Sequence, residues 1–311
     1  MTVPLVTVNI LTHDRRAELA SSLRTMREKL TYPRERLELI VVDNGSSDGT
    51  RDMLLRDFPE VRVIENENVG AAGWTRGFDA GRGDYFLVLD DDCFLSGDGL
   101  DRAVRAAEDE RADLVSFRVI SAADPSFEFN SHYRVGLLSF WGCAALISRR
   151  AIEKLDGFDP NIFIWANELE FTMRLLDAGF RHLFLPEVTA VHMKPPPRDF
   201  PASSHSIHVR HLAYVAAKLL RPADTGLAVA NVATRTLLWL LRSPSRWRAL
   251  PALVDGVRLG LRSRAPVRPA VSRLYRRNFR EFASLPAYLR SEAYYARRSD
   301  LYPSASGSLS V

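Results

Sequence analysis

Short apolar runs alternate with longer amphipathic stretches along the first 90 residues. The apolar, β-branched runs predict strands at residues 6–11, 37–42, 61–64 and 85–89. The amphipathic stretches predict helices at 15–30 and 68–80, and one more that ends at 58. Strands separated by helices of this length are typical of βαβ units with a parallel sheet. Because ligands bind beyond the carboxyl ends of such strands, we expect the turns after Leu11, Val42 and Leu89 to open onto one edge.

The pattern changes after residue 114 and again after the proline run at 195–197. Strands near 114–119, 143–148 and 182–185 and a helix at 167–178 predict a mixed second half. Beyond it, helices are predicted at 207–220, 227–241, 247–261 and 273–297. We therefore expect one domain over residues 1–200, whose second half starts at about 114, a helical region over 201–300 and a disordered tail over 301–311.

Charge separates the same two regions. The net charge is only +4, but residues 205–311 hold 18 Lys and Arg against 5 Asp and Glu, whereas residues 1–204 carry a balance of −9. Two cysteines cannot form a disulfide framework and fit a reducing compartment. No signal peptide is visible, and the most apolar late stretch, 226–241, is shorter than the roughly 20 residues of a spanning helix. We expect a cytoplasmic protein, with peripheral membrane contact as a further option.

Three adjacent carboxylates, Asp90, Asp91 and Asp92, follow the predicted strand at 85–89. Neighbouring carboxylates repel one another, and hard oxygen ligands at this density suit Mg²⁺ or Mn²⁺, especially when substrate phosphates complete the coordination shell. The alternative is a solvated acidic turn that caps the next helix. The placement at a strand end in an α/β sheet favours the metal site.

Two further turns carry candidate nucleotide-binding residues. Asp43 ends the second strand, where its carboxylate can accept the imide N–H of a pyrimidine base or form an Asx turn. In the small-residue loop at 68–77, Gly70 and Gly73 allow backbone to approach a ligand, and Arg76 can meet phosphate charge. No Walker pattern is present, which argues against a P-loop ATPase.

Glu168 and Glu170 lie in the first turn of the predicted helix at 167–178. One explanation for both residues is structural, because acidic side chains in a first helical turn complement the helix dipole. Nearby aromatic residues could instead raise a carboxyl pKa and make one of the two a general base. His192 is a candidate metal ligand or a structural histidine, and His13 can stack on a base or cap a helix.

These motifs, taken in order, resemble family 2 glycosyltransferases. The segments that carry the resemblance span residues 3–195 and read V-T-V-N-I-L-T-H-D-R, V-V-D-N-G-S-S-D-G-T, N-V-G-A-A-G-W-T-R-G, V-L-D-D-D, G-F-D-P-N-I-F-I-W-A-N-E-L-E-F-T-M-R-L and V-x-H. Among family members, bacterial galactofuranosyl- and rhamnosyltransferases are nearest in motif. The resemblance implies a GT-A fold, which is a Rossmann-like mixed α/β sheet, here with a C-terminal helical region.

The resemblance also implies a role for each candidate residue. Glu168 would be the base that deprotonates the acceptor hydroxyl, with Glu170 as the second choice. A Mn²⁺ or Mg²⁺ ion would be held by Asp92, His192 and Asp90. The nucleotide sugar would be bound by Thr12, His13, Asp43, Gly70, Gly73, Arg76, Asp90 and Asp91.

The expected reaction is an inverting sugar transfer from a nucleoside diphosphate sugar, with UDP or dTDP favoured through Asp43. The acceptor could be a glycan, a lipid-linked sugar or a small metabolite, and the basic helices could lie on an anionic membrane or pack as a lid. A nucleotidyltransferase is the first alternative, although residues 7–15 lack its Gly-rich basic loop. A non-catalytic nucleotide-sugar binding protein is the second, and no nucleic-acid-binding motif is present.

Overall fold

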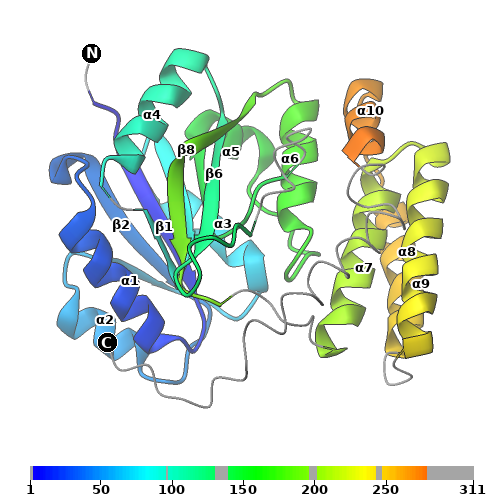
Figure 1. The fold of residues 1–311 in the computed structure, drawn as a ribbon, viewed down its shortest axis with the longest axis horizontal. Helices are drawn as coiled ribbons and strands as arrows, with labels where there is room; N and C mark the ends of the chain where they lie inside the picture. Colours follow the sequence, from blue (N-terminus) through cyan, green and yellow to red (C-terminus); the bar gives the residue numbers. More distant parts are fainter. Residues whose placement is uncertain (1–2, 96, 130–138, 196–201, 243–246, 279–311) are drawn as a thin grey trace. The chain divides into compact units, whose positions relative to one another are not determined.

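The computed structural model describes residues 3–95, 97–129, 139–195, 202–242 and 247–278 (Figure 1). Contacts divide the chain into two compact units, residues 1–195 and 196–311. The N-terminal unit contains the sheet, and the described part of the C-terminal unit is helical.

The N-terminal unit is built on one eight-stranded mixed sheet. Its strands lie in the order β3-β2-β1-β4-β7-β6-β8-β5. They are β1 (Val6–Thr12), β2 (Leu37–Asp43), β3 (Arg62–Glu65), β4 (Tyr85–Asp90), β5 (Cys93–Leu95), β6 (Leu114–Ser121), β7 (Ala144–Ser148) and β8 (His182–His192). The strands β3, β2, β1 and β4 are mutually parallel, and β7 is antiparallel to both β4 and β6. This arrangement confirms the predicted α/β class with a mixed sheet.

Helices alternate with these strands and cover the sheet. They are α1 (Arg16–Lys29), α2 (Thr50–Asp57), α3 (Trp74–Ala80), α4 (Gly99–Glu110), α5 (Arg149–Leu155) and α6 (Asn167–Asp177), with short 3₁₀ turns at Arg34–Arg36 and Gly70–Gly73. One core cluster joins α3, α5 and α6 to β4 and β7 through Phe78, Phe86, Ile147, Ile152 and Phe171. In β4 every residue before Asp90 is buried, which explains its uninterrupted apolar run.

Three elements of this unit were not predicted from the sequence, and a fourth is longer than predicted. The new elements are α4, α5 and β5. Strand β8 continues seven residues beyond the predicted end at 185 because its pairing with β6 jumps from Leu185 to Thr189. The jump skips Pro186, Glu187 and Val188, after which the strand continues to His192.

The C-terminal unit contains α7 (Ala202–Leu219), α8 (Pro222–Arg242), α9 (Ala249–Arg262) and α10 (Pro269–Asn278). Helices α7 and α9 pack closely because Gly256 and Gly260 have no side chain. A Cβ on Gly256 would lie 2.1 Å from the Arg210 carbonyl oxygen, and one on Gly260 would lie 2.5 Å from that of Tyr214. The rest of the helix predicted to reach 297, and the predicted tail, lie outside the described residues.

Candidate active site

The carboxyl ends of three neighbouring parallel strands lie side by side. Thr12 at the end of β1 is paired with Asp43 at the end of β2, and Leu11 is paired with Asp90 at the end of β4. The predicted convergence of these strand ends on one edge is therefore confirmed.

The acidic triplet is held from several directions. The Thr12 hydroxyl donates to Asp91 Oδ2 at 2.9 Å. Asp92 is 1% exposed, and its Oδ1 lies 3.0 Å from His192 Nε2. The two residues meet because β5, which follows the triplet directly, pairs antiparallel with the end of β8, with Cys93 opposite His192.

Burial and neighbouring charges give the three carboxyls different pKa values. Burial raises the pKa of Asp91 to about 7, against the opposing effect of Arg15. Burial and the negative charge of Asp92 raise the pKa of Asp90. Burial also acts to raise the pKa of Asp92, but His192, Lys194 and Arg15 outweigh it and lower that pKa, so Asp92 is the anion of the set.

The donor set fits a divalent cation. One ligand atom each from Asp90, Asp92 and His192 lies within 4.8 Å of the others. Asp92 Oδ1 and both ring nitrogens of His192 are buried and form no hydrogen bond of good geometry within the described structure. Two carboxylates and one imidazole suit Mn²⁺ and can also hold Mg²⁺. These residues could therefore supply three ligands to such an ion.

Glu168 lies in the first turn of α6, close to the same edge. Helix α6 begins after two non-glycine residues with positive φ, Trp165 at 56° and Ala166 at 63°. Such a conformation costs of order 1–3 kcal/mol per residue and is found most often at functional sites. The partly buried Glu168 carboxyl has its pKa raised to about 7 by burial and by the charge of Asp90.

A glycine makes room for this carboxyl. A Cβ on Gly142 would lie 2.3 Å from Glu168 Oε1, closer than real Cβ contacts allow. The Gly142 backbone N–H also donates to the carboxyl, which limits the rise in pKa. Gly142 therefore positions Glu168, a role that was not predicted from the sequence.

Glu170 has a different environment from Glu168. Its side chain is fully buried and accepts two hydrogen bonds from Arg174, at 2.7 and 2.8 Å. The same guanidinium donates to the carbonyl oxygens of Leu155 and Gly157. This network joins α6 to the end of α5, so the geometry favours Glu168 over Glu170 as the base.

The turn after β2 is fixed by its own side chains. Asp43 Oδ1 accepts from the N–H of Ser46, three residues on, at 2.8 Å, and Asp43 is 4% exposed. Asn44, which was not a predicted site residue, donates to the Gly70 carbonyl at 2.9 Å and so connects this turn to the small-residue loop. The half-exposed His13 ring has Nδ1 3.0 Å from the Asn44 carbonyl oxygen.

The two loop glycines are packed tightly against protein atoms. A Cβ on Gly70, which has φ of +64°, would lie 1.9 Å from the Phe163 carbonyl oxygen. One on Gly73 would lie 2.5 Å from Asn44 Oδ1. Packing thus explains both glycines without a ligand. Arg76 is exposed on α3.

Two cations at the triplet were also missed by sequence reasoning. Arg15 Nη2 lies 2.6 Å and Lys194 Nζ lies 3.3 Å from Asp92 Oδ2. Arg15 stands at the end of the first motif and Lys194 two residues after His192, so proximity to candidate residues was the available signal.

Comparison with known proteins agrees with this geometry. A sequence profile described as glycosyl transferase family 2 matches residues 7–167, just over half of the chain. The chain belongs to glycosyltransferase family 2.

Individual relatives are distant. Glycosyltransferase AglE of Haloferax volcanii is 28% identical over 211 residues, which cover 63% of this chain and 69% of AglE. The probable glycosyltransferase YdaM of Bacillus subtilis is 28% identical over 219 residues, and the match spans about half (51%) of its length. Family membership supports glycosyl transfer from a nucleotide sugar.

Solved structures show the same fold. The mannosyltransferase PcManGT from Pyrobaculum calidifontis, in complex with GDP-Man and Mn²⁺, has a TM-score of 0.60 at 20% identity, covering 97% of this chain and 87% of that one. S. aureus TarS 1–349 has a TM-score of 0.60 at 16% identity, and the match covers 96% of this chain and 88% of the TarS chain. These similarities confirm the predicted GT-A type of fold.

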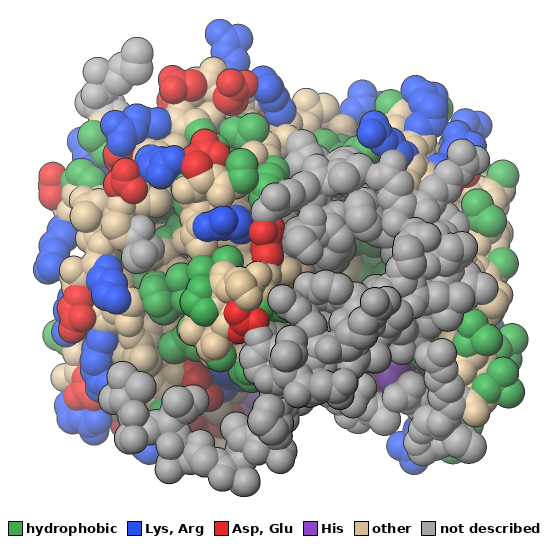
Figure 2. Space-filling view, in the orientation of Figure 1, with side chains coloured by type: hydrophobic (Ala, Val, Ile, Leu, Met, Phe, Trp, Pro, Cys, Tyr) green, Lys and Arg blue, Asp and Glu red, His purple; other side chains and the backbone are tan. Residues whose placement is uncertain are grey.

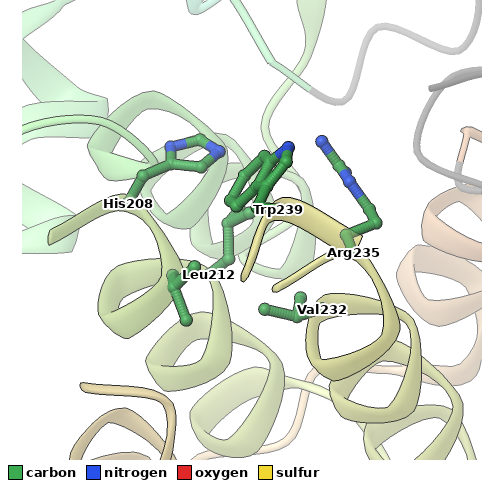
Figure 3. Close-up of a pocket in the computed structure, with 6 residues that line it drawn as sticks. His208, Leu212, Val232, Arg235 and Trp239 are labelled. Carbon is green, nitrogen blue, oxygen red and sulfur yellow. The ribbon is translucent and has the colours of Figure 1, made fainter. Parts of the chain in front are cut away.

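The helical unit of this family 2 chain contains a small cavity (Figure 3). It holds about 10 Å³ and is lined by His208, Val209, Leu212, Val232, Arg235 and Trp239. Burial and nearby cations lower the pKa of His208 to about 3, so this imidazole is neutral at pH 7. A volume of this size holds about one water molecule, which is too small for a substrate.

Proposed function

We propose that the chain is a metal-dependent, inverting glycosyltransferase that moves a sugar from a nucleoside diphosphate sugar to an acceptor hydroxyl. The observation that carries the proposal is the meeting of two kinds of group at one sheet edge. The triad Asp90, Asp92 and His192 can hold a cation, and Glu168 lies close enough to Asp90 for that charge to raise its pKa.

The triad supports departure of the nucleoside diphosphate. Asp92, which remains ionised, and His192 would hold Mn²⁺ or Mg²⁺, with Asp90 as the third ligand. Such an ion, when bound, stabilises the negative charge that develops on the leaving diphosphate. The Thr12 hydroxyl donates to Asp91 beside the triad and so connects the end of β1 to the triplet.

Glu168 supports activation of the acceptor. A carboxyl with a pKa of about 7 is ionised in part at neutral pH and is basic enough to remove the proton from a hydroxyl that is attacking C1. Of the two acidic residues in the first turn of α6, Glu168 is the candidate for this role, because Glu170 is bound by Arg174. A single base on the acceptor side is consistent with in-line displacement and inversion at the anomeric carbon.

The nucleobase is proposed to bind at the end of β2. Asp43 Oδ1 accepts from Ser46, and Oδ2 would accept the N3–H of uracil or thymine. PcManGT was solved with a guanine nucleotide, and GalNAc-T7 with UDP. Both nucleotides therefore belong in the test.

The acceptor is proposed to be a glycan, a lipid-linked sugar or a small metabolite. One relative, from Pseudomonas syringae pv. syringae, is named as an undecaprenyl-phosphate transferase, although the match covers only 33% of it. The basic charge of residues 205–311 supports peripheral contact with an anionic membrane. Within the part of the chain that the structure describes, no helix is long and apolar enough to cross a bilayer.

A thermal-shift panel tests the proposal. Unfolding temperatures would be measured with UDP, dTDP, GDP and ADP, each with and without Mn²⁺, for the wild type and for Asp92→Asn. A ligand that binds the native state raises the unfolding temperature, so we expect one nucleotide to do so only with Mn²⁺ and only in the wild type. If no nucleotide shifts the wild type with Mn²⁺, the proposed donor site is refuted.

A further inference from the structure

Two cationic side chains contact the acidic triplet, one from a residue before it in the sequence and one from a residue after it. Arg15 immediately precedes α1, and its guanidinium lies 2.6 Å (Nη2) from Asp92 Oδ2 and 3.0 Å (Nε) from Asp91 Oδ1. Lys194 follows β8, and its ammonium lies 3.3 Å from Asp92 Oδ2. Both cations therefore neutralise the carboxylate that is proposed to hold the metal.

The two oxygens of Asp92 have different partners. Oδ1 lies toward His192, on the side of the metal triad, and Oδ2 is bound by Arg15 and Lys194. A divalent ion at the triad would therefore lie near two positive charges in a buried site, where their repulsion is poorly screened. In the absence of further anions these cations compete with the metal for Asp92.

A diphosphate would reverse this balance. Its negative charges offset the charge of the ion, and its oxygens accept hydrogen bonds from a guanidinium in a bidentate manner and from an ammonium as a point charge. Both side chains can turn toward such a ligand, because Arg15 is 31% exposed and Lys194 is 49% exposed, whereas Asp92 is 1% exposed. The cations are thus the movable part of the ion-pair cluster.

Given the donor site proposed above, we infer that Arg15 and Lys194 make metal binding conditional on the donor diphosphate. Without a donor, the two cations occupy Asp92 and weaken the binding of the metal. With a donor, they transfer to the diphosphate, and the metal and the donor bind cooperatively. This order prevents a tightly bound ion from remaining in the site between turnovers.

The opposite explanation is that Arg15 only stabilises a buried carboxylate. The two explanations predict different signs for the affinity of the metal alone. If Arg15 competes with the ion, its neutralisation strengthens the binding of Mn²⁺. If Arg15 only holds the triplet in place, its neutralisation weakens or does not change that binding.

The test measures the dissociation constant of Mn²⁺ alone, by electron paramagnetic resonance of the free ion, and then that of UDP and of GDP at saturating Mn²⁺. For Arg15→Gln we expect Mn²⁺ alone to bind about tenfold more tightly and the nucleotide about tenfold more weakly, within the usual range of coupling between sites. Arg15→Lys keeps the charge and should resemble the wild type in the affinity for Mn²⁺ alone. Arg24→Gln, at an exposed arginine on α1, is the matched control and should change neither.

Lys194→Gln repeats the comparison at a more exposed position, in case Arg15→Gln does not fold. Mn²⁺ affinity that is unchanged or lower in the folded variants overturns the inference, even if the wild type transfers sugar. If the wild type binds no Mn²⁺ with or without nucleotide, the proposed metal site itself fails, which is a separate result.

Discussion

At the scale of single residues, the site depends on carboxyls whose surroundings make them chemically different. Asp91 and Glu168 each have a pKa raised to about 7, mainly by burial, whereas the pKa of Asp92 is lowered by His192, Lys194 and Arg15. Residue identity, spacing and the family resemblance made these carboxyls candidates. The pairing of Glu170 with Arg174 and the approach of Arg15 could not be predicted, because both depend on side-chain direction in the folded protein.

The raised pKa of Glu168 predicts a pH dependence of the reaction. The base must be ionised, and its ionised fraction increases with pH through about 7. We expect the transfer rate at saturating donor to fall about tenfold for each pH unit below that value and to level off above it. A pH–rate profile in which the acid limb lies near 4, the ordinary range of an exposed Glu, would contradict the assignment.

At the scale of elements, the strands that end at the site were the most predictable part. The apolar runs at β1, β2 and β4 are buried central strands, so their sequence signal is strong. Strand β8 was predicted to stop at 185, although the strand resumes its pairing with β6 at Thr189. Helix α4 has buried apolar residues at helical spacing, Leu100, Val104 and Ala107. This pattern was present in the sequence, but the helix was not predicted from it.

Gly142, in the loop before β7, is predicted to position Glu168 because it has no side chain. In Gly142→Ala, the new Cβ would be 2.3 Å from Glu168 Oε1, so the carboxyl must move. A displacement of about 1 Å can cost about a hundredfold in rate, and we expect such a fall in the transfer rate with little change in Mn²⁺ affinity. Gly226→Ala, where nothing lies within 4 Å of the new Cβ, is the control, and equal rates in both variants would refute the role of Gly142.

At the scale of the whole molecule, the acidic and basic regions differ in surface as well as in charge. Helix α8 exposes an apolar stripe at Leu227, Leu237 and Leu241, with exposed fractions of 54%, 53% and 82%. Figure 2 shows hydrophobic side chains at the surface of the helical unit. Exposed apolar residues in a strongly basic region are typical of a surface that lies on anionic lipid. The charge asymmetry was visible in the sequence. The stripe could be recognised only once the bounds of α8 and the exposure of its side chains were known.

This surface predicts reversible membrane binding. The wild type should float with vesicles that contain anionic phosphatidylglycerol and remain in the aqueous fraction with neutral phosphatidylcholine. Leu237→Glu combined with Leu241→Glu should reduce flotation several-fold, because it places charge in the stripe. Leu55→Glu, at a residue that is 59% exposed on α2, is the matched control. Equal flotation of all three proteins would remove the stripe from the account.

The central claim is that Glu168 deprotonates the acceptor on a chain whose metal site binds the donor. The most direct measurement is the sugar transfer rate of Glu168→Gln at saturating Mn²⁺ and donor, with donor affinity measured in parallel. The amide has nearly the same shape but cannot accept the proton, so we predict a loss of about 10²- to 10⁴-fold in transfer with donor affinity unchanged. Transfer by Glu168→Gln at the wild-type rate would contradict the account.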